Sequence, residues 1–218
     1  MYGNPTRTVG DVFTAVKRQF GDESGVQLAD NDLVMWINDA QDEINNRNSI
    51  LKAKSSGTSV AGQGDYSFST IIPSAQIHKI ESIHYDGVRL PNMSFAQAEE
   101  RIFAADPQRT QSGTPVLWYE WAGALTFWPT PDAAKAIDIY FTAKPARVNS
   151  TLSTPLSVPD KYYRDVVRYV LQQAYEMDED WQASQAKAQQ FDSSVNSMGE
   201  EDRTAQNMTY DTITVYDI

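Results

Sequence analysis

A change of periodicity along the chain restricts the fold most: apolar residues repeat at helical spacing near both ends and at strand spacing between them. Residues 9–20 carry one apolar stripe at three- and four-residue steps, and residues 33–44 carry a second. The same pattern returns in residues 163–177 and 181–198. Such stripes predict amphipathic helices that bury one face. We expect two helix pairs in one bundle, the first an antiparallel hairpin.

Local signals set the ends of these helices. Asp30 or Asn31 is suited to cap the second helix, because short polar side chains accept a hydrogen bond from the first free backbone N–H groups. Gly199 is suited to end the last helix, where a left-handed residue is common. The acidic run Asp178-Glu179-Asp180 marks the corner between the third and fourth helices.

The segment between the helix pairs reads as β structure. Residues 77–85 are rich in β-formers, and Asp86-Gly87 is a hairpin signal. A second hairpin is expected around Ala122-Gly123, and a capping-box pattern at Ser94 predicts a short helix over residues 95–103. The polar, glycine-rich residues 55–64 predict a flexible segment.

The predicted fold class is therefore α+β. It comprises a helical bundle of about four helices, a β-rich insert and an extended C-terminal tail. We place the bundle in residues 1–54 and 155–198, the insert in residues 55–154 and the tail in residues 199–218.

Charge and composition narrow the function. The 218 residues include 18 Lys and Arg against 29 Asp and Glu, which gives a net charge of −11. Proteins that grip nucleic acid neutralise phosphates with clustered cations, and Lys17-Arg18 is the only adjacent basic pair in the chain. Sequence-specific binding of DNA or RNA is therefore not expected. No apolar run is long enough to span a membrane, and a chain without cysteine fits a reducing compartment.

The search for catalytic chemistry finds no motif. His78 and His84 are spaced about 20 Å apart on one predicted strand, too far for a shared metal ion, and nucleophile and phosphate-loop patterns are missing from the sequence. We expect no enzyme activity, no cofactor and no metal. Asp39 and Glu43 share a helix face, which leaves an acid/base hydrolase as an alternative to be tested through a raised carboxylate pKa in a pocket.

Aromatic residues concentrate in the second predicted hairpin, at Trp118, Tyr119, Trp121, Phe127 and Trp128. If exposed, these rings could stack on sugars, so a carbohydrate-binding module is a second alternative. Alternate aromatic residues on two paired strands more often form the core of a small sheet. We therefore expect a packing role.

Three stretches carry a resemblance to a known family. They are residues 32–44 (DLVMWINDAQDEI), residues 113–131 with their paired Gly-Thr-Pro and Trp-Pro-Thr-Pro elements, and residues 158–163 (VPDKYY) leading into the last two helices. With this layout, the chain resembles head-to-tail adaptor proteins of tailed bacteriophages, also called head completion or connector proteins. Each stretch is typical of the fold, and none is catalytic.

The resemblance implies a structural virion protein at the head–tail junction, present in the host cytoplasm during assembly. It implies a ring, expected to be a dodecamer of this chain, that joins the portal protein to a tail nozzle or tail tube protein. DNA would pass through the channel without specific binding, and no membrane is involved. A tail completion or tube-end protein, with six-fold rings and no portal contact, is the nearest alternative.

Two sets of residues acquire roles under this scheme. The C-terminal tail is implied to reach the portal, and its alternating end could add a strand to a partner's sheet; the expected docking residues are Tyr210, Ile213, Val215, Tyr216 and Ile218. Carboxylates that line the channel would repel the DNA phosphates. We expect some of the following acids to face it: Asp39, Asp42, Glu43, Asp178, Glu179 and Asp180.

Overall fold

The computed structural model describes residues 6–72 and 77–208. Within these ranges the elements are, in order, α1 (Val9–Phe20), α2 (Asp30–Asn48), β1 (Lys52–Thr58), β2 (Asp65–Ser67), α3 (Phe68–Ile71), β3 (Ile77–Tyr85), β4 (Val88–Leu90), α4 (Phe95–Ala105), β5 (Ser112–Gly113), β6 (Leu117–Trp121), β7 (Ala124–Trp128), β8 (Thr130–Pro131), β9 (Ala136–Ala143), a 3₁₀ turn (Asp160–Tyr162), α5 (Tyr163–Met177) and α6 (Trp181–Met208). The strands pair antiparallel except for β5 with β8. The predicted mixed α+β class is confirmed.

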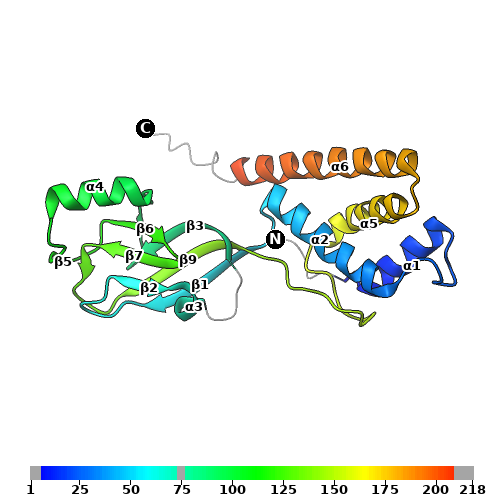
Figure 1. Ribbon diagram of the computed structural model, residues 1–218. Helices are drawn as coiled ribbons and strands as arrows, with labels where there is room; N and C mark the ends of the chain where they lie inside the picture. The colour runs from blue at the N-terminus through cyan, green and yellow to red at the C-terminus, as the bar shows by residue number, and fades with distance from the viewer. Residues whose placement is uncertain (1–5, 73–76, 209–218) are drawn as a thin grey trace, which may run out of the picture. The chain divides into compact units, whose positions relative to one another are not determined.

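The chain divides into two compact units. Residues 1–51 and 145–218 form one, which we call the helical unit, and residues 52–144 form the other, which we call the β unit. Figure 1 shows α1, α2, α5 and α6 in the helical unit and all the strands in the β unit. Each unit has its own buried apolar cluster, so each is described separately.

The first helix forms as its sequence predicts. Thr8 caps α1: its hydroxyl accepts from the N–H of Asp11, whose carboxylate in turn accepts from the N–H of Thr8. This reciprocal capping box satisfies two backbone donors that the first turn would otherwise leave free. At the other end Gly21 adopts a left-handed conformation (φ 92°) and stops the helix.

The expected cap of the second helix is wrong. Ala29 occupies the N-cap position of α2 and makes no side-chain capping bond. Asp30 is instead the first helical residue, and its carboxylate binds the Lys17 ammonium at 2.8 Å. An acid in the first turn still interacts favourably with the helix dipole, so the sequence signal was real but its role was misassigned.

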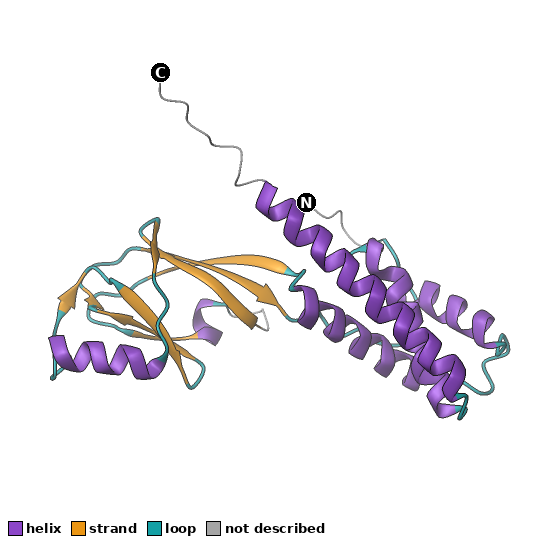
Figure 2. Cartoon of the chain, turned by 90° about the horizontal axis from the view of Figure 1, so that it is seen from above, coloured by secondary structure: helices purple, strands orange, loops and turns teal. Residues whose placement is uncertain are grey.

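The helical unit is organised around α5. Both α1 and α2 pack chiefly against α5 and make fewer contacts with each other. Figures 1 and 2 show α6 alongside α5, the helix with which it makes most of its contacts. The core draws on all four helices and on the return segment before α5; among its fully buried members are Val12, Val16, Leu33, Ile37, Ile44, Val158, Val166, Val170 and Val195.

The last helix does not end at Gly199. It continues to Met208, so the first ten residues of the expected tail are helical and only residues 209–218 lie outside the described chain. Gly199 serves the approach of two helices: a Cβ atom there would overlap the side-chain amide of Asn48 at the end of α2. That amide donates to the Val195 carbonyl at 2.8 Å, which fixes it against α6.

The β unit is built on a four-stranded sheet of order β1-β9-β3-β4. Its first strand corrects the expectation of a flexible segment over residues 55–64, because residues 55–58 belong to β1 and pair with β9. The polar side chains of β1 alternate between exposed and half-buried positions. This pattern suits an edge strand with one solvated face, and composition alone hid it.

Both predicted hairpins are confirmed. β3 and β4 turn at Asp86-Gly87, and β6 pairs with β7 through the turn at Ala122-Gly123. The capping box of α4 also forms as predicted, since the Ser94 hydroxyl accepts from the Gln97 N–H while the Gln97 side chain accepts from the Ser94 N–H. These local signals hold because each needs only neighbouring residues.

Gly199→Ala tests the close approach of α2 and α6. The added methyl group displaces the Asn48 amide from its bonds, so we expect a loss of about 1–3 kcal/mol of unfolding free energy, larger than the helix-propensity gain of up to about 1 kcal/mol. Chemical denaturation measures the net change in unfolding free energy. Ser197→Ala, at an exposed position on the same helix, should stay within about 0.5 kcal/mol of wild type. A Gly199→Ala protein as stable as this control would contradict the assignment.

Candidate interaction surfaces

A row of amide side chains on α2 fixes the points at which the chain leaves and re-enters the helical unit. Asn45 accepts from the Leu51 N–H at 3.1 Å, just before the chain departs. Asn38 both accepts from the Val148 N–H at 2.9 Å and donates to the Val148 carbonyl at 3.2 Å. The fully buried Gln41 accepts from the Ser157 N–H at 2.6 Å.

These amides replace secondary structure for an irregular segment. Residues 145–159 run without helix or ladder pairing into the 3₁₀ turn, apart from an isolated bridge between Thr8 and Pro155. Buried backbone donors in such a segment need side-chain partners. The helical pattern places Asn38 on the face opposite the apolar stripe of α2, and its contacts with residues 145–159 cannot be read from that pattern.

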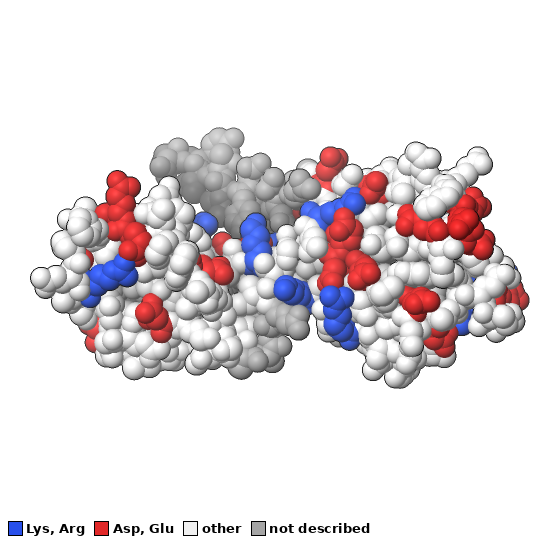
Figure 3. Space-filling model, in the orientation of Figure 1, with Lys and Arg blue, Asp and Glu red and all other residues white. Residues whose placement is uncertain are grey.

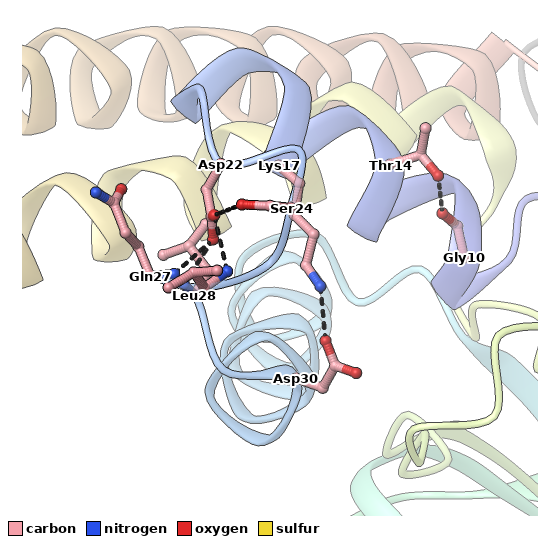
Figure 4. A network of polar contacts seen from close by, with 9 residues as sticks. Gly10, Thr14, Lys17, Asp22, Ser24, Gln27, Leu28 and Asp30 are labelled. Atoms are coloured by element: carbon pink, nitrogen blue, oxygen red, sulfur yellow. Dashed lines mark hydrogen bonds and ion pairs between the residues drawn. The ribbon is translucent and has the colours of Figure 1, made fainter.

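The loop between α1 and α2 is held by one carboxylate. Asp22 is almost fully buried, and its oxygens accept from the N–H groups of Val26, Gln27 and Leu28 at 2.8–2.9 Å. Figure 4 shows these bonds converging on Asp22, with the Ser24 hydroxyl as a fourth donor. The three backbone bonds, that of Leu28 above all, hold the pKa of Asp22 below its ordinary value.

This loop shares one end of the helical unit with the corner between α5 and α6, as both ribbon views show. The Phe20 and Tyr175 rings, 5.4 Å apart, link the two elements there. We call this region the loop end and define it by residues 21–29 and 177–181. It exposes three large apolar side chains, Val26 at 83%, Trp181 at 67% and Met177 at 47%. A rigid loop that presents apolar side chains to solvent is typical of a protein-contact surface.

The expected channel acids fall into separate groups. The corner acids Asp178, Glu179 and Asp180 are exposed at the loop end, and the Asp180 carboxylate also accepts from the Ala183 N–H in the first turn of α6. Asp39 is exposed on α2. The other two α2 acids form ion pairs, Asp42 with Arg147 at 2.7 Å and Glu43 with Arg47 at 2.6 Å.

Charge is unevenly spread over the surface. On the side of the helical unit that faces the viewer in Figure 3, acidic side chains outnumber basic ones. The expected portal-docking residues Tyr210, Ile213, Val215, Tyr216 and Ile218 lie outside the described residues.

The aromatic cluster packs mainly inside the β unit. Trp118, Tyr119 and Phe127 are buried, and Phe127 meets the Tyr66 and Tyr85 rings edge-on. Trp121 is the exposed member, and its ring stacks on Phe95 of α4 with centroids 4.1 Å apart. The cluster therefore lacks the flat row of free rings that a carbohydrate-binding surface requires.

The described residues also bear on a hydrolase carboxylate, a metal site and a membrane-spanning helix. Burial raises the pKa of Asp165, but this carboxylate is fully covered and binds Arg168 at 2.7 Å, so a substrate has no access to it. No group of three potential metal ligands occurs in residues 6–72 and 77–208. No helix in the same ranges has the length and apolar character to cross a membrane.

The two units have separate apolar cores, and the helical unit presents exposed apolar and acidic side chains at its loop end, as a protein that contacts other proteins would. The comparison with protein families identifies it further. The sequence pattern of the SU10 adaptor protein family matches residues 7–214, nearly the whole chain. The protein belongs to this family of phage head-to-tail adaptors, and its role is that of a structural adaptor of the virion. Comparison with curated proteins gives no match.

Asp22→Asn tests the carboxylate that organises the loop end. An amide has one oxygen and a donor where the loop offers three N–H groups, so we expect a lower thermal midpoint at pH 7. The folded-state pKa of Asp22 is below the ordinary 3.8, so its stabilising contribution is present above pH 4 and is lost as the pH falls through the folded-state value.

The difference between the thermal midpoints of wild type and Asp22→Asn should therefore narrow between pH 7 and pH 3. Glu23→Gln, an exposed neighbour, removes the same charge without touching the loop's backbone and is the control. A difference in midpoint that stays constant with pH would show that the Asp22 charge does not hold the loop.

Proposed function

We propose that the protein assembles into a ring of twelve copies that joins the portal to the tail and lets DNA pass through its channel. The observation that carries the proposal is the family match, which spans both units and reaches residue 214, inside the C-terminal segment. Copies of the chain, the portal protein and a tail nozzle or tail tube protein are the proposed partners. Assembly would take place in the host cytoplasm.

The described surfaces support this assignment. The helical unit keeps its apolar residues in one core and leaves its sides polar, as expected for subunits that meet edge to edge through wet contacts. The loop end adds rigidly presented apolar side chains. Nothing in this arrangement requires a cofactor.

Electron microscopy of the full chain mixed with portal rings and with tail tubes from the same phage tests the proposal. Twelve-fold rings seated on the portal are the expected result. Six-fold rings attached to tail tubes, with no portal contact, would instead identify a tail completion protein. A chain that remains monomeric with both partners present would overturn the adaptor ring.

The C-terminal segment is the proposed portal anchor. Deleting residues 209–218 leaves α6 complete and should abolish portal attachment, as should the longer deletion of residues 205–218. Ile213→Asp and Val215→Asp should each weaken attachment roughly tenfold or more, because burying one such side chain contributes about 1.5–3 kcal/mol.

Thr212→Asp and Thr214→Asp supply the control for this prediction. They add the same charge at two positions that are not among the expected docking residues, and they should weaken attachment less than Ile213→Asp and Val215→Asp do. Co-sedimentation with portal rings measures all four variants. Equal effects of all four substitutions would rule out docking through Ile213 and Val215, and attachment that survives the deletion would rule out the C-terminal segment as the anchor.

We also propose that some of the six acids named above line the channel. The corner acids are exposed, and Asp178 and Glu179 are in no ion pair among the described residues. Asp178→Lys/Glu179→Lys should make assembled rings retain linear duplex DNA at low salt and release it as the salt rises. Glu100→Lys/Glu120→Lys, at two exposed positions of the β unit, is the control for the change of charge. Rings of the corner variant that retain no more DNA than wild type would place these acids outside the channel.

A further inference from the structure

A groove with basic walls runs along one side of the helical unit. It has a volume of about 350 Å³ and lies between α1, which contributes Ala15 and Gln19, and α6, with α5 between them. Its charged lining residues are all basic: Arg164, Arg168 and Lys187. A neighbouring hollow of about 560 Å³ shares Arg168 with it and is otherwise lined by serine, glutamine and alanine of α6. We call the two together the basic groove.

Most of the positive charge in this groove is uncompensated. Arg168 binds the buried Asp165 at 2.7 Å, so its charge is balanced. Arg164 and Lys187 form no ion pair within the described part of the chain. In a protein with a net charge of −11, two free cations in a groove that has no acidic residue in its lining favour an acidic protein surface as the occupant.

Another side of the helical unit carries the opposite sign. There Arg47 of α2 binds Glu43 at 2.6 Å and Asp192 of α6 at 2.7 Å. Two acids thus share one cation, and the exposed Asp39 adds a further negative charge. We call the surface formed by Asp39, Glu43 and Asp192 the acidic side.

The pKa of Tyr169 on α5 is affected by the negative charges on this side. Burial raises the pKa of its phenol, and the carboxylates of Asp39 and Glu43 raise it further. Its ring also packs edge-on against Phe191 of α6, with centroids 5.3 Å apart. Tyr169 of α5 therefore lies beside the acidic residues of α2 and packs against α6, so the acidic side is bordered by all three helices.

The two surfaces lie on different flanks of the same helices. Lys187 and Asp192 are five residues apart on α6, and Arg164 and Tyr169 are five residues apart on α5. At 3.6 residues per turn, each pair is separated by about 140° around its helix axis. A single copy cannot bring its own basic groove and acidic side together, whereas two adjacent copies can.

We propose that the basic groove of one copy receives the acidic side of the next copy, so that these two surfaces form the seam between neighbours in the ring. This inference rests on the proposed ring. A closed cyclic ring requires a heterologous contact in which two different surfaces meet, and complementary charge fixes their register and excludes pairing of like surfaces. Asp39 and Glu43 then belong to the seam, which leaves the corner acids as the candidates for the channel.

Charge exchange between the two surfaces tests the seam in the full chain. Lys187→Glu cancels the excess positive charge of the groove and Asp39→Lys cancels the excess negative charge of the acidic side, so each variant alone should assemble roughly tenfold or more weakly on portal rings. Mixed in equal amounts, the two variants should recover assembly, because the unchanged groove of one variant can meet the unchanged acidic side of the other, and the two substituted positions carry opposite charges where they meet. Both side chains are free of ion pairs among the described residues, so thermal midpoints should match wild type.

The same charge changes elsewhere provide the controls. Lys144→Glu and Glu100→Lys alter exposed residues of the β unit and should assemble like wild type, alone or mixed. The number of copies bound per portal, counted by native mass spectrometry, is the readout. Wild type that forms no ring would overturn the proposed function and this inference with it. Normal wild-type rings with unimpaired variants, or with no recovery on mixing, would overturn the seam alone.

Cross-linking gives an independent measurement, because the chain contains no cysteine. With Lys187→Cys and Asp39→Cys in one chain, a short bismaleimide should link assembled copies into a ladder of dimers, trimers and longer chains. Each single-cysteine variant should stop at dimers or remain monomeric. A ladder absent from rings that form normally would show that these two surfaces do not meet.

Discussion

The helical unit depends on the amides of α2. An apolar stripe alone would hold α2 against α5, but it would leave the segment between β9 and α5 without partners for its backbone. Asn38, Gln41 and Asn45 supply those partners and bind the chain on both sides of its excursion into the β unit. Because a buried donor without an acceptor costs about 1–3 kcal/mol, this short row of side chains decides where the irregular segment lies and thus where α5 begins.

The acidic composition acquires meaning once the charges are sorted by position. Several carboxylates hold the fold: Asp22 organises a loop, and Asp160 binds the backbone of residues 6 and 7. Others form ion pairs at the surface, where each contributes little to stability. The remaining charges are separated on the helical unit. Arg164 and Lys187, which form no ion pair among the described residues, line the basic groove, and acidic residues are in excess on the acidic side. A net charge of −11 by itself predicts none of this arrangement.

Sequence reasoning succeeded where a structural signal is local. The capping box at Ser94, the turn at Asp86-Gly87 and the apolar stripe of α1 each depend on residues within one or two turns, and all form as predicted. It failed where a distant partner decides. A glycine at position 199 is typical of a helix end. In this structure the position must be glycine for a different reason, because the Asn48 amide occupies the space that a side chain would fill. Residues 55–58 of β1 were predicted to be flexible because their partners on β9 lie about eighty residues further along the chain.

Candidate contact residues were harder to find for the same reason. Acids near the corner stood out as a run in the sequence, whereas Arg164 and Lys187 are isolated cations on different helices, and only the packing of α5 against α6 brings them to one groove. Their only sequence signal was the one-turn spacing of Arg164 and Arg168. A surface built from several helices leaves almost no trace along a single chain.

The pairing of β1 with β9 also affects how easily the β unit could be exchanged during evolution. Lys52, the first residue of the unit, lies opposite Thr142, two residues before its end, and residues paired in this way have Cα atoms only about 5 Å apart. The first and last residues of the β unit therefore lie close together in space. To the helical unit, the β unit is a single closed loop whose entropic cost rises only slowly with length, so evolution can replace its contents without rerouting the helices.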